Sequence, residues 1–334
     1  MKRTISFILC LILMLGTMLT GCVENQPTET PDDSEQQNEQ TPPAEDSTPD
    51  PEPEPEPEPE RFRIIMSPDM HMTRLLDWNG LTTEDRAQMW IDSILEEHES
   101  DPIDLVVLQG DITLDHWAHG GNHIKDGSSD TEIFVDEYLS QLPDEIEVFV
   151  LPGNHEQYGE DDWYFITGNE RQDYMVFGDH LILLIDTFAD GLDPEEHHDG
   201  IYTGIDMEFV NEVVAEFPDK NIWIFTHFMH MPFESEEFKE FLRTNTNVRA
   251  VFHGHNHTLN VEDLGEEYNH VKLIMCGQFS YTGSGAVLDQ YYSFRDLILQ
   301  EDYATCSYII PYRDMKIAGE YVEYVYETDV EFEY

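Results

Sequence analysis

The stretch Leu105-Val106-Val107-Leu108-Gln109-Gly110-Asp111 holds four consecutive apolar residues, then a polar residue, a glycine and a carboxylate. Such a short apolar run between an aspartate and a glycine predicts a strand that is buried on both faces. Residues 61–67 predict a second strand upstream. Between the two strands, Thr82 and Asp85 have the spacing of a helix N-terminus and precede an apolar face of helical period. This order is typical of a β-α-β unit at the start of an α/β domain.

Further along the chain, the same patterns predict alternating helices and strands, followed by a strand-rich C-terminal part. Expected helices cover residues 131–142, 206–217 and 234–242. Expected strands cover residues 147–151, 175–177, 180–186, 221–226, 249–252, 271–275, 291–299, 305–312 and 321–326. The pair around Gly178-Asp179 predicts a hairpin. The expected fold class is α/β (α+β), with two packed sheets and helices outside them.

Metal-binding side chains follow five of the apolar runs. The five pieces are Asp69-Met70-His71, Gly110-Asp111, Gly153-Asn154-His155-Glu156, Thr226-His227 and Gly254-His255-Asn256-His257. Carboxylates, a carboxamide and imidazoles together suit a pair of borderline divalent ions. Because each piece comes just after a predicted strand, an open α/β architecture would gather them at one edge. The set points to metal-assisted hydrolysis of phosphoesters. Gly121-Asn122-His123 repeats part of the third piece but follows no predicted strand.

In this order, the five blocks resemble those of the calcineurin-like metallophosphoesterase family: DxH, GD, GNH followed by Glu or Asp, a single His, and GHxH. The resemblance covers most of residues 61 to about 280. It implies a β-sandwich of two mixed sheets flanked by helices, with two divalent metal ions at one edge. It also implies a ligand set. Asp69, His71 and His257 would hold one ion, Asn154, His227 and His255 the other, and Asp111 would bridge both. These ligands suit Mn, Zn and Fe alike.

The expected chemistry is attack of a metal-bridging hydroxide on a phosphoester. Asp111 and His155 are the expected catalytic residues. His155 would not bind metal and would protonate the leaving oxygen or stabilise charge on the phosphoryl group. The sequence therefore predicts a hydrolase of small phosphodiesters or phosphomonoesters, with diesters favoured because few Lys or Arg residues lie near the blocks. The alternative is a surface-anchored lipoprotein that binds metal or ligand without turnover, against which the intact His155 argues.

The loop after the second block departs from the family pattern. Leu114 stands three positions after Asp111, where many relatives carry an acidic residue or Asn that orients the histidine of the third block. Asp115 could take that part through a loop shift, or the support could be missing. A tyrosine in the same place marks the purple acid phosphatase branch, so Leu114 argues against a tyrosinate-bound iron. Trp117 could stack on an organic leaving group or simply pack, and His230 could reach the substrate or serve as a supporting or surface residue.

The N-terminal residues predict export and anchoring. An apolar stretch, residues 5–19, follows Met1-Lys2-Arg3 and is too short for a comfortable membrane span. Leu19-Thr20-Gly21-Cys22 comes next and resembles a bacterial lipobox. Residues 1–21 are thus expected to be a lipoprotein signal peptide, with a lipid on Cys22 that anchors the protein to the outer face of the cell membrane. An uncleaved signal anchor with a chance cysteine is the alternative.

Residues 22–60 are expected to be a disordered acidic stalk, and residues 61–334 the metallophosphoesterase domain. Residues 23–60 have no Lys, Arg or aromatic residue and end in a Pro-Glu repeat. They cannot bury enough apolar surface to fold, and the repeat favours extended polyproline II geometry. A partner-binding proline motif is the weaker alternative, because no basic residues flank it.

The net charge limits the partners of the chain. Its formal value is -55 at pH 7, and the acidic excess continues through the predicted domain. A nucleic-acid polymer would be repelled, since its binding requires phosphate neutralisation by a basic face. Small phosphorylated substrates remain compatible, because two divalent cations reverse the charge locally.

Cys276 and Cys306 remain in the predicted domain, and two buried free thiols are favoured over a disulfide.

Overall fold

The computed structural model describes residues 61–78, 80–117, 129–193, 195–280, 292–312, 315 and 329–334. The predicted signal peptide, the predicted stalk and the expected strand at 321–326 lie outside these residues. Among the described residues, none of the helices combines the length and apolar character needed to cross a membrane.

The first sheet has six strands in the order β12-β11-β10-β1-β2-β3. Their bounds are β1 (Arg61–Ser67), β2 (Leu105–Gln109), β3 (Glu147–Leu151), β10 (Phe294–Gln300), β11 (Tyr303–Ile309) and β12 (Val330–Glu333). Strands β1, β2 and β3 run parallel, as a β-α-β start requires. Strands β10, β11 and β12 extend the sheet with antiparallel pairs. The last three described strands of the strand-rich C-terminal part therefore complete the first sheet.

The second sheet also has six strands, in the order β4-β5-β6-β7-β9-β8. Their bounds are β4 (Asp173–Phe177), β5 (His180–Leu184), β6 (Asn221–Phe225), β7 (Val248–His253), β8 (Leu259–Asp263) and β9 (Lys272–Cys276). The central strands β5, β6, β7 and β9 run parallel. The edge strands β4 and β8 pair antiparallel, and β4 with β5 forms the predicted hairpin around Gly178-Asp179.

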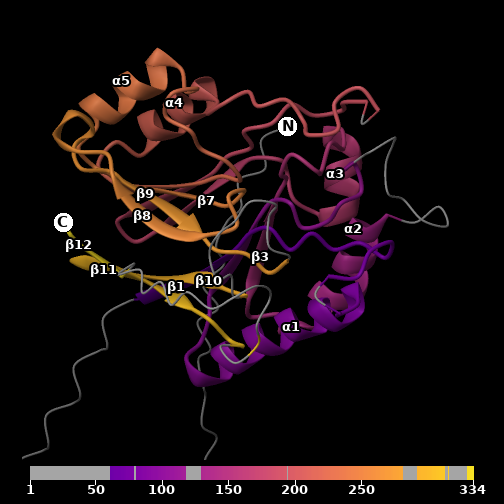
Figure 1. Cartoon of the computed structure of the whole chain (residues 1–334). Helices are drawn as coiled ribbons and strands as arrows, with labels where there is room; N and C mark the ends of the chain where they lie inside the picture. The colour runs from indigo at the N-terminus through magenta and orange to yellow at the C-terminus, as the bar shows by residue number, and fades with distance from the viewer. Residues whose placement is uncertain are drawn as a thin grey trace, which may run out of the picture. The chain divides into compact units, whose positions relative to one another are not determined.

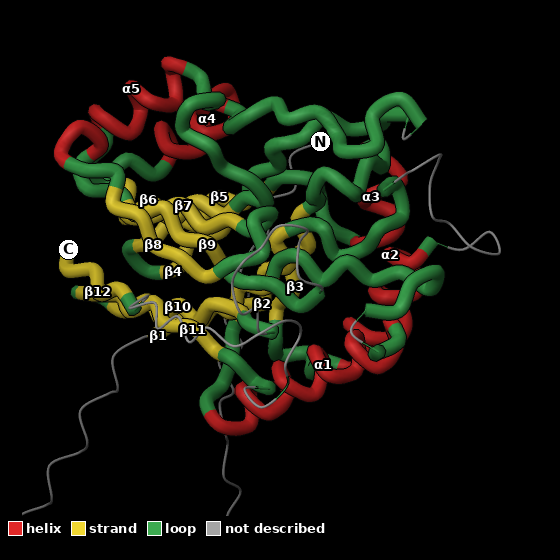
Figure 2. The backbone as a smooth tube through the Cα atoms, viewed as in Figure 1, coloured by secondary structure: helices red, strands yellow, loops and turns green. Residues whose placement is uncertain are grey.

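The two sheets pack face to face, and helices cover their outer faces (Figures 1 and 2). Side chains such as Ile64 and Val107 of the first sheet share an apolar core with Trp223 and Phe252 of the second. The outer layers consist of α1 (Thr83–Ser100), α2 (Asp130–Ile133), η1 (Phe134–Tyr138), η2 (Leu139–Gln141) and α3 (Glu160–Thr167) on the first sheet, and α4 (Met207–Glu216) and α5 (Glu236–Thr244) on the second. The predicted sandwich of two mixed sheets flanked by helices is confirmed.

Local signals explain where the helices begin. Thr82 and Asp85 form the expected capping box at the start of α1, and the side chain of Asp206 caps α4. The helix expected at 131–142 is instead a short α-helix, a π turn and a 3₁₀ turn in succession.

Cys276 and Cys306 are both buried free thiols, as the sequence favoured.

Candidate metal centre

The turns after neighbouring parallel strands are joined by backbone hydrogen bonds. The amide of Asp69 donates to the carbonyl of Gly110 at 3.0 Å, and that of His71 donates to the carbonyl of Asp111 at 2.9 Å. In the second sheet, the amide of Gly254 donates to the carbonyl of His227 at 2.8 Å. Both sheets therefore present their turns at the carboxyl ends of parallel strands, which is where α/β folds build sites.

Five of the predicted ligands adopt the left-handed backbone region. They are Asp69 (φ 56°), His71 (φ 47°), Asp111 (φ 51°), His255 (φ 66°) and His257 (φ 53°). Only two other non-glycine residues of the described part do so. Because this region costs residues with side chains about 1 kcal/mol or more each, five such residues at one edge mark a functional site rather than ordinary packing.

Glycines before three of the ligands allow the turns to approach closely. A Cβ on Gly153 would lie 2.3 Å from the Asp111 Oδ1 atom, and one on Gly254 would lie 2.3 Å from the Cβ of Pro68. Gly110 has φ +79°, and a Cβ there would lie 2.7 Å from the His227 ring. Any larger residue at these positions would push the ligand-bearing turns apart.

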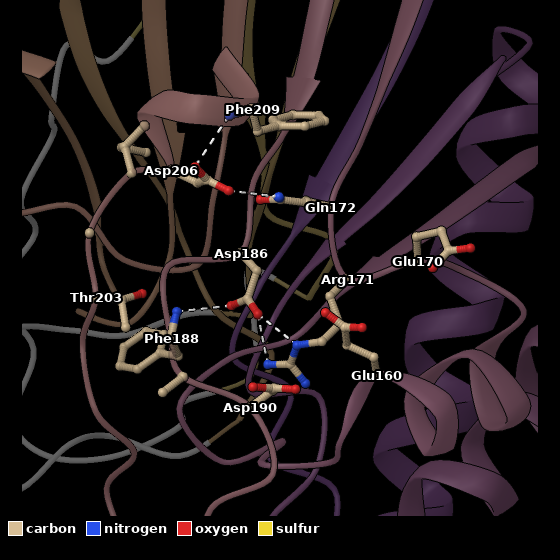
Figure 3. Close-up of a pocket in the computed structure, with 13 residues that line it drawn as sticks. Glu160, Glu170, Arg171, Gln172, Asp186, Phe188, Asp190, Thr203, Asp206 and Phe209 are labelled. Atoms are coloured by element: carbon tan, nitrogen blue, oxygen red, sulfur yellow. Dashed lines mark hydrogen bonds and ion pairs between the residues drawn. The ribbon is translucent and has the colours of Figure 1, made fainter. Parts of the chain in front are cut away.

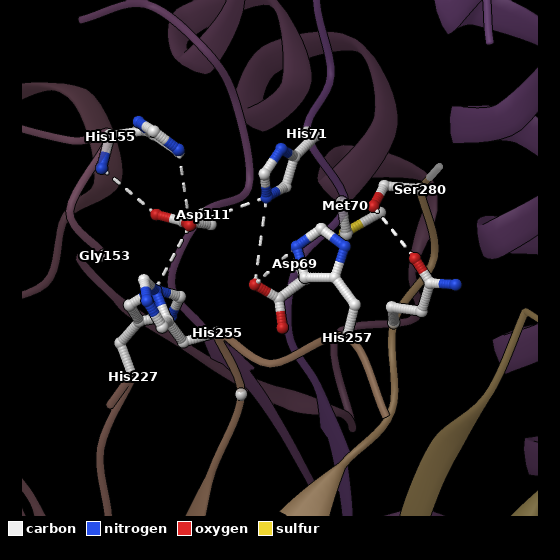
Figure 4. Close-up of polar contacts among 12 residues, drawn as sticks. Asp69, Met70, His71, Asp111, Gly153, His155, His227, His255, His257 and Ser280 are labelled. Carbon is white, nitrogen blue, oxygen red and sulfur yellow. Dashed lines mark hydrogen bonds and ion pairs between the residues drawn. The ribbon is translucent and has the colours of Figure 1, made fainter. Parts of the chain in front are cut away.

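Asp111 occupies the middle of the assembled side chains (Figure 4). Its Oδ2 atom lies 3.2 Å from the Nε2 atom of His227 and 3.5 Å from that of His71. On the side of His71, the Oδ1 atom of Asp69 lies 3.5 Å from Nε2 of His257 and 3.8 Å from Nε2 of His71. Asp69, His71 and His257 thus form one compact group, with Asp111 at its border.

The second group surrounds the carboxamide of Asn154. Its Oδ1 atom lies 3.1 Å from Nε2 of His227 and 2.9 Å from Nδ1 of His255. The Nδ1 atom of His227 lies 2.7 Å from the carbonyl oxygen of Gln109, to which it can only donate. This hydrogen bond fixes the ring so that Nε2 faces Asp111 and Asn154, the arrangement found in histidines that bind metals. Although burial opposes it, Asp111 raises the pKa of His227 to about 9 in the metal-free protein. The structure thus brings all seven predicted ligands together.

The carboxylate of Asp69 lacks the partners that a buried charge requires. Its side chain is fully buried, and neither oxygen accepts a hydrogen bond from the described residues. Asp111 is also buried, and its ion-pair contacts are all with histidines. Burying two carboxylates with histidines as their charged neighbours is costly, so a bound cation fits this arrangement. The donor set of oxygen and imidazole nitrogen fits divalent metal ions.

His155 lies beside Asp111, and its ring forms a third cluster of possible metal ligands with His71 and Asp111. The Nε2 atom of His155 also lies 3.3 Å from the Nδ2 atom of Asn154. The amide of His155 donates to the Oδ1 atom of Asp111 at 3.0 Å, and its Nε2 atom lies 3.7 Å from Oδ2. Burial lowers the pKa of the His155 ring to about 3 in the metal-free protein. The ring of Trp117 stands edge-on to the His155 ring, with 6.4 Å between centroids. The loop after Asp111 therefore reaches the centre.

Asp115 does not support His155. Its carboxylate accepts hydrogen bonds from the amides of Asp130 and Thr131, the hydroxyl of Thr131 at 2.7 Å and the hydroxyl of Tyr158 at 2.6 Å. All these partners lie at the start of α2 or in the segment after the third block. Asp115 thus holds the loop in place, and the loop shift considered from the sequence does not occur.

Glu156 is the last residue of the third block, and no role was predicted for it from the sequence. This fully buried carboxylate accepts hydrogen bonds from the amides of Asp111, Thr113 and Gly153, each at 2.8 Å. Burial and the neighbouring Asp111 raise the pKa of Glu156 to about 7. By holding two adjacent turns at once, Glu156 fixes the position of Asp111 relative to Asn154.

Two further supporting residues left no signal in the sequence. Arg86 of α1 is fully buried and donates to the carbonyl of Met70 at 2.7 Å and to the carbonyls of His71 and Phe279 at 3.1 Å each. Gln109 of β2 donates from its side chain to the carbonyl of Phe252 in the opposite sheet, at 3.1 Å. Arg86 braces the first block, and Gln109 joins the two sheets beneath the centre.

A pocket of about 620 Å³ lies next to the second group (Figure 3). Phe188 lines it, and the ring of Phe188 also lies 5.7 Å from the His227 ring. Arg171, the basic residue of the lining, is paired with Asp186 at 2.7 Å. Burial raises the pKa of Asp186 to about 6 despite this pairing. The rest of the charged lining is acidic, with Glu160, Glu170, Asp190 and Asp206.

Comparisons with known proteins agree with this geometry. A family model described as calcineurin-like phosphoesterase matches residues 62–259. A dimetal phosphatase from Danio rerio is similar in structure, with a TM-score of 0.56, 13% identity, and coverage of 82% of this chain and 99% of that one. GAP50, the anchor in the inner membrane complex of Plasmodium, has a TM-score of 0.50 and 10% identity, with coverage of 82% and 89% respectively. None of the curated proteins matches the chain.

Proposed function

This chain belongs to the calcineurin-like phosphoesterase family, and we propose that it is a binuclear metal-dependent hydrolase of small phosphodiesters or phosphomonoesters. The observation that carries the proposal is the position of Asp111. Its carboxylate lies between two groups of buried oxygen and nitrogen donors, within 3.5 Å of a histidine of each group. A carboxylate between two donor groups is what a pair of ions requires of a bridging ligand.

We assign the ligands as the family resemblance implies. Asp69, His71 and His257 would hold one ion, Asn154, His227 and His255 the other, and Asp111 would bridge the two. The assignment is supported by the oxygens of Asp69, which accept no hydrogen bond from the described residues, and by the orientation of His227 by Gln109. We expect the two ions to be Mn, Zn or Fe, since these ligands suit all three metals.

In this proposal the bound ions supply an activated water and polarise the phosphoryl group. The chain itself positions the reaction. Asp111 and Asn154 would fix the two ions relative to each other, because Glu156 and Gly153 hold their turns together. His155, at the border of the centre, would donate a hydrogen bond or a proton to the phosphoryl or leaving oxygen. The buried surroundings would strengthen each of these interactions.

Charge around the centre favours diesters over monoesters. The described arginines nearest the five blocks are already paired: Arg74 with Asp130, Arg171 with Asp186, and Arg86 with three carbonyls. A dianionic monoester would find little positive charge there beyond the metal ions. A singly charged diester needs less compensation, so we expect it to be the better substrate.

Hydrolysis of paired chromogenic phosphomonoester and phosphodiester substrates tests this function. The full-length protein would be loaded with Mn, Zn or Fe and compared with its Asp111→Ala variant. We expect metal-dependent turnover that the variant loses, with the diester hydrolysed faster. Binding of two ions without turnover of either ester class would contradict the proposal. It would favour the alternative hypothesis, a lipoprotein that binds metal without turnover.

We also propose that the protein is exported and anchored by a lipid on Cys22, with residues 22–60 as a stalk. The support is the lipobox-like Leu19-Thr20-Gly21-Cys22 and the acidic Pro-Glu composition that follows. Incorporation of a labelled fatty acid in bacteria, compared between the wild type and Cys22→Ser, tests it. Equal labelling of the two proteins, or none in either, would overturn the anchor.

A further inference from the structure

A row of aromatic rings runs from the second metal-ligand group toward the surface. Phe228 lies 4.5 Å from the ring of His255, centroid to centroid. His230 is nearly parallel to Phe228, with centroids 6.3 Å apart and 10° between planes, and Phe233 lies 4.6 Å from His230. We call Phe228, His230 and Phe233 the aromatic row. Its inner end touches a predicted ligand, so a substrate held at the centre would have these rings beside it.

The inner end of the row is firmly supported. Tyr202 packs edge-on against Phe228 at 5.1 Å, and Phe188 packs against Tyr202 at 5.6 Å. The hydroxyl of Tyr202 donates to the carboxylate of Glu234, which is buried and also accepts from the amide of Ile205 at 3.2 Å. A buried, hydrogen-bonded brace of this kind fixes Phe228 in one orientation, which a specific stacking surface requires.

The outer end of the row is open to solvent. His230 is exposed, and the side chain of Phe233 is 69% exposed. A single exposed phenylalanine needs no explanation, and Phe165 of α3 is 83% exposed. The difference is connectivity: the described rings place Phe233 in contact with His230 and, through Phe228, with the metal centre. Phe165 makes no such ring contact within the described residues.

The two segments that carry the aromatic row and its supporting residues contain neither lysine nor arginine. They are residues 187–206 and 226–235, and they contain several Asp and Glu residues. Such a surface offers no lysine or arginine to an anionic leaving group, for instance one with further phosphates. It can hold an uncharged ring, because aromatic rings that pack against one another gain more than the burial of their area alone provides.

We propose that the aromatic row is a stacking surface for a planar, uncharged aromatic leaving group, so that the preferred substrates are phosphoesters of ring-bearing alcohols rather than of small alkyl alcohols. This inference rests on the proposed phosphohydrolase function and specifies its substrate class. Phe228 and Phe233 are then specificity-determining residues, and His230 reaches the substrate through its ring face.

Kinetics with two leaving groups of matched acidity test the row. The metal-loaded full-length protein would be assayed on a methyl phosphodiester with a phenyl leaving group and on one with a fluorinated alkyl leaving group. We expect the wild type to prefer the phenyl ester in kcat/KM. Phe228→Leu and Phe233→Leu, which keep apolar bulk but remove the ring, should each reduce that preference about threefold to tenfold. The same change at the exposed control position, Phe165→Leu, should leave the preference intact.

A binding measurement separates failure of this inference from failure of the function. Titration calorimetry with phenylphosphonate and propylphosphonate reports ring preference without turnover. Activity on both esters with unchanged preference in Phe228→Leu and Phe233→Leu would overturn the row and leave the phosphohydrolase standing. Absence of turnover in the wild type would count against the function, and the phosphonate titrations alone would then test the aromatic row. A preference for phenylphosphonate that the two variants lose would support the row. Equal binding of both phosphonates by the wild type would overturn it.

Discussion

The two ends of β1 both bury charge, but they satisfy it in opposite ways. Near the start of β1, the Arg63 side chain is 3% exposed and lies 2.9 Å from both Glu97 and Asp296. Its Nε atom also donates to Asp296 at 3.0 Å. Just beyond the other end, Asp69 is fully buried and no hydrogen bond from the described residues reaches it.

This contrast separates a structural ion cluster from a site that needs a ligand. Around Arg63, every charge has its counter-charge within the chain, and the same guanidinium also donates to the backbone carbonyl of Glu97 at 3.2 Å. Around Asp69 and Asp111 the described chain offers carboxylates and imidazoles but no Lys or Arg partner. Burial of these charges does not by itself make the free energy of folding more favourable. The difference implies that removing a charge should cost more stability in the Arg63 cluster than at the Asp69 end of β1, where the charged neighbours are histidines.

The largest effect is expected at the bridging position. Asp111→Asn keeps the shape of the side chain but removes the charge that two ions would share. We expect kcat/KM to fall about a thousandfold or more. The free energy of unfolding of the metal-free variant should change less than after the same substitution in the Arg63 cluster, because Asp111 is paired with histidines and not with an arginine. Steady-state kinetics and denaturant unfolding of the metal-free protein measure the two quantities.

The matched control is the same change in the Arg63 cluster. Asp296→Asn should lower the free energy of unfolding and leave kcat/KM per folded molecule intact. If the two variants behaved alike, with both losing stability or both losing activity, the contrast between the ends of β1 would be mistaken.

Removing Arg63 should cost stability rather than activity. Arg63→Met leaves two carboxylates near each other without a cation, and truncation of a buried ion pair costs about 3–5 kcal/mol. We expect a lower denaturant midpoint with unchanged metal affinity. Because Met fills much of the same space, adding Asp296→Leu should recover part of the loss. A double variant no more stable than Arg63→Met would argue that lost packing, not the unpaired charge, causes the effect.

Much of the sandwich was predictable, because its strands are buried on both faces and read as apolar runs. Residues 61–67 and 147–151 were predicted with the bounds that β1 and β3 have. The elements that the sequence did not predict bury little. In α3 only Trp163 is buried, and its N-cap is a glycine without a side-chain hydrogen bond. β8 has no buried residue, and β12 has one. Such edge elements are fixed by their neighbours and carry no periodic pattern of their own.

The candidate site divides in the same way. Its ligand-type residues follow strand ends, so their gathering could be predicted from residue types and order alone. The supports could not. Arg86 lies in the middle of a helix, and nothing local reveals that its guanidinium caps carbonyls of the first block. Gln109 looks like a strand residue, yet it joins two sheets through a partner more than a hundred residues away. Such contacts depend on how sheets and helices pack.

Metal removal should convert the incomplete end of β1 into a measurable loss of stability. Each ion at about 100 times its Kd adds about 2.7 kcal/mol to the free energy of unfolding. We therefore expect chelation of both ions to lower the Tm by roughly 10–20 °C, as read by scanning calorimetry. Arg63→Met should keep this metal-dependent shift, whereas Asp69→Asn should reduce it. A chelated protein with the Tm of the loaded one would show that no ion is bound at this edge.

The smallest effect is expected where a fixed cation supports the metal centre indirectly. Arg86 is fully buried and has no carboxylate partner among the described residues, and burial lowers its pKa to about 10. Its three hydrogen bonds to carbonyls hold the turn that carries Asp69 and His71, both at positive φ. Without them the turn can relax, so Arg86→Met should weaken one ion by about 10–100-fold and spare the other.

Titration of the metal-free protein with Mn²⁺, followed by calorimetry, would resolve two steps in the wild type and a selective loss of one in Arg86→Met. Arg86→Lys keeps a charge but fewer donors, and it should fall between the two. Equal weakening of both ions would assign Arg86 to general packing of α1 instead. If Arg86→Met folds poorly, Arg86→Lys still provides the test. If Arg86 only stabilised the fold, Arg86→Lys would leave both titration steps unchanged. Arg86 would then resemble Arg63 in function, although it lies beside the opposite end of β1.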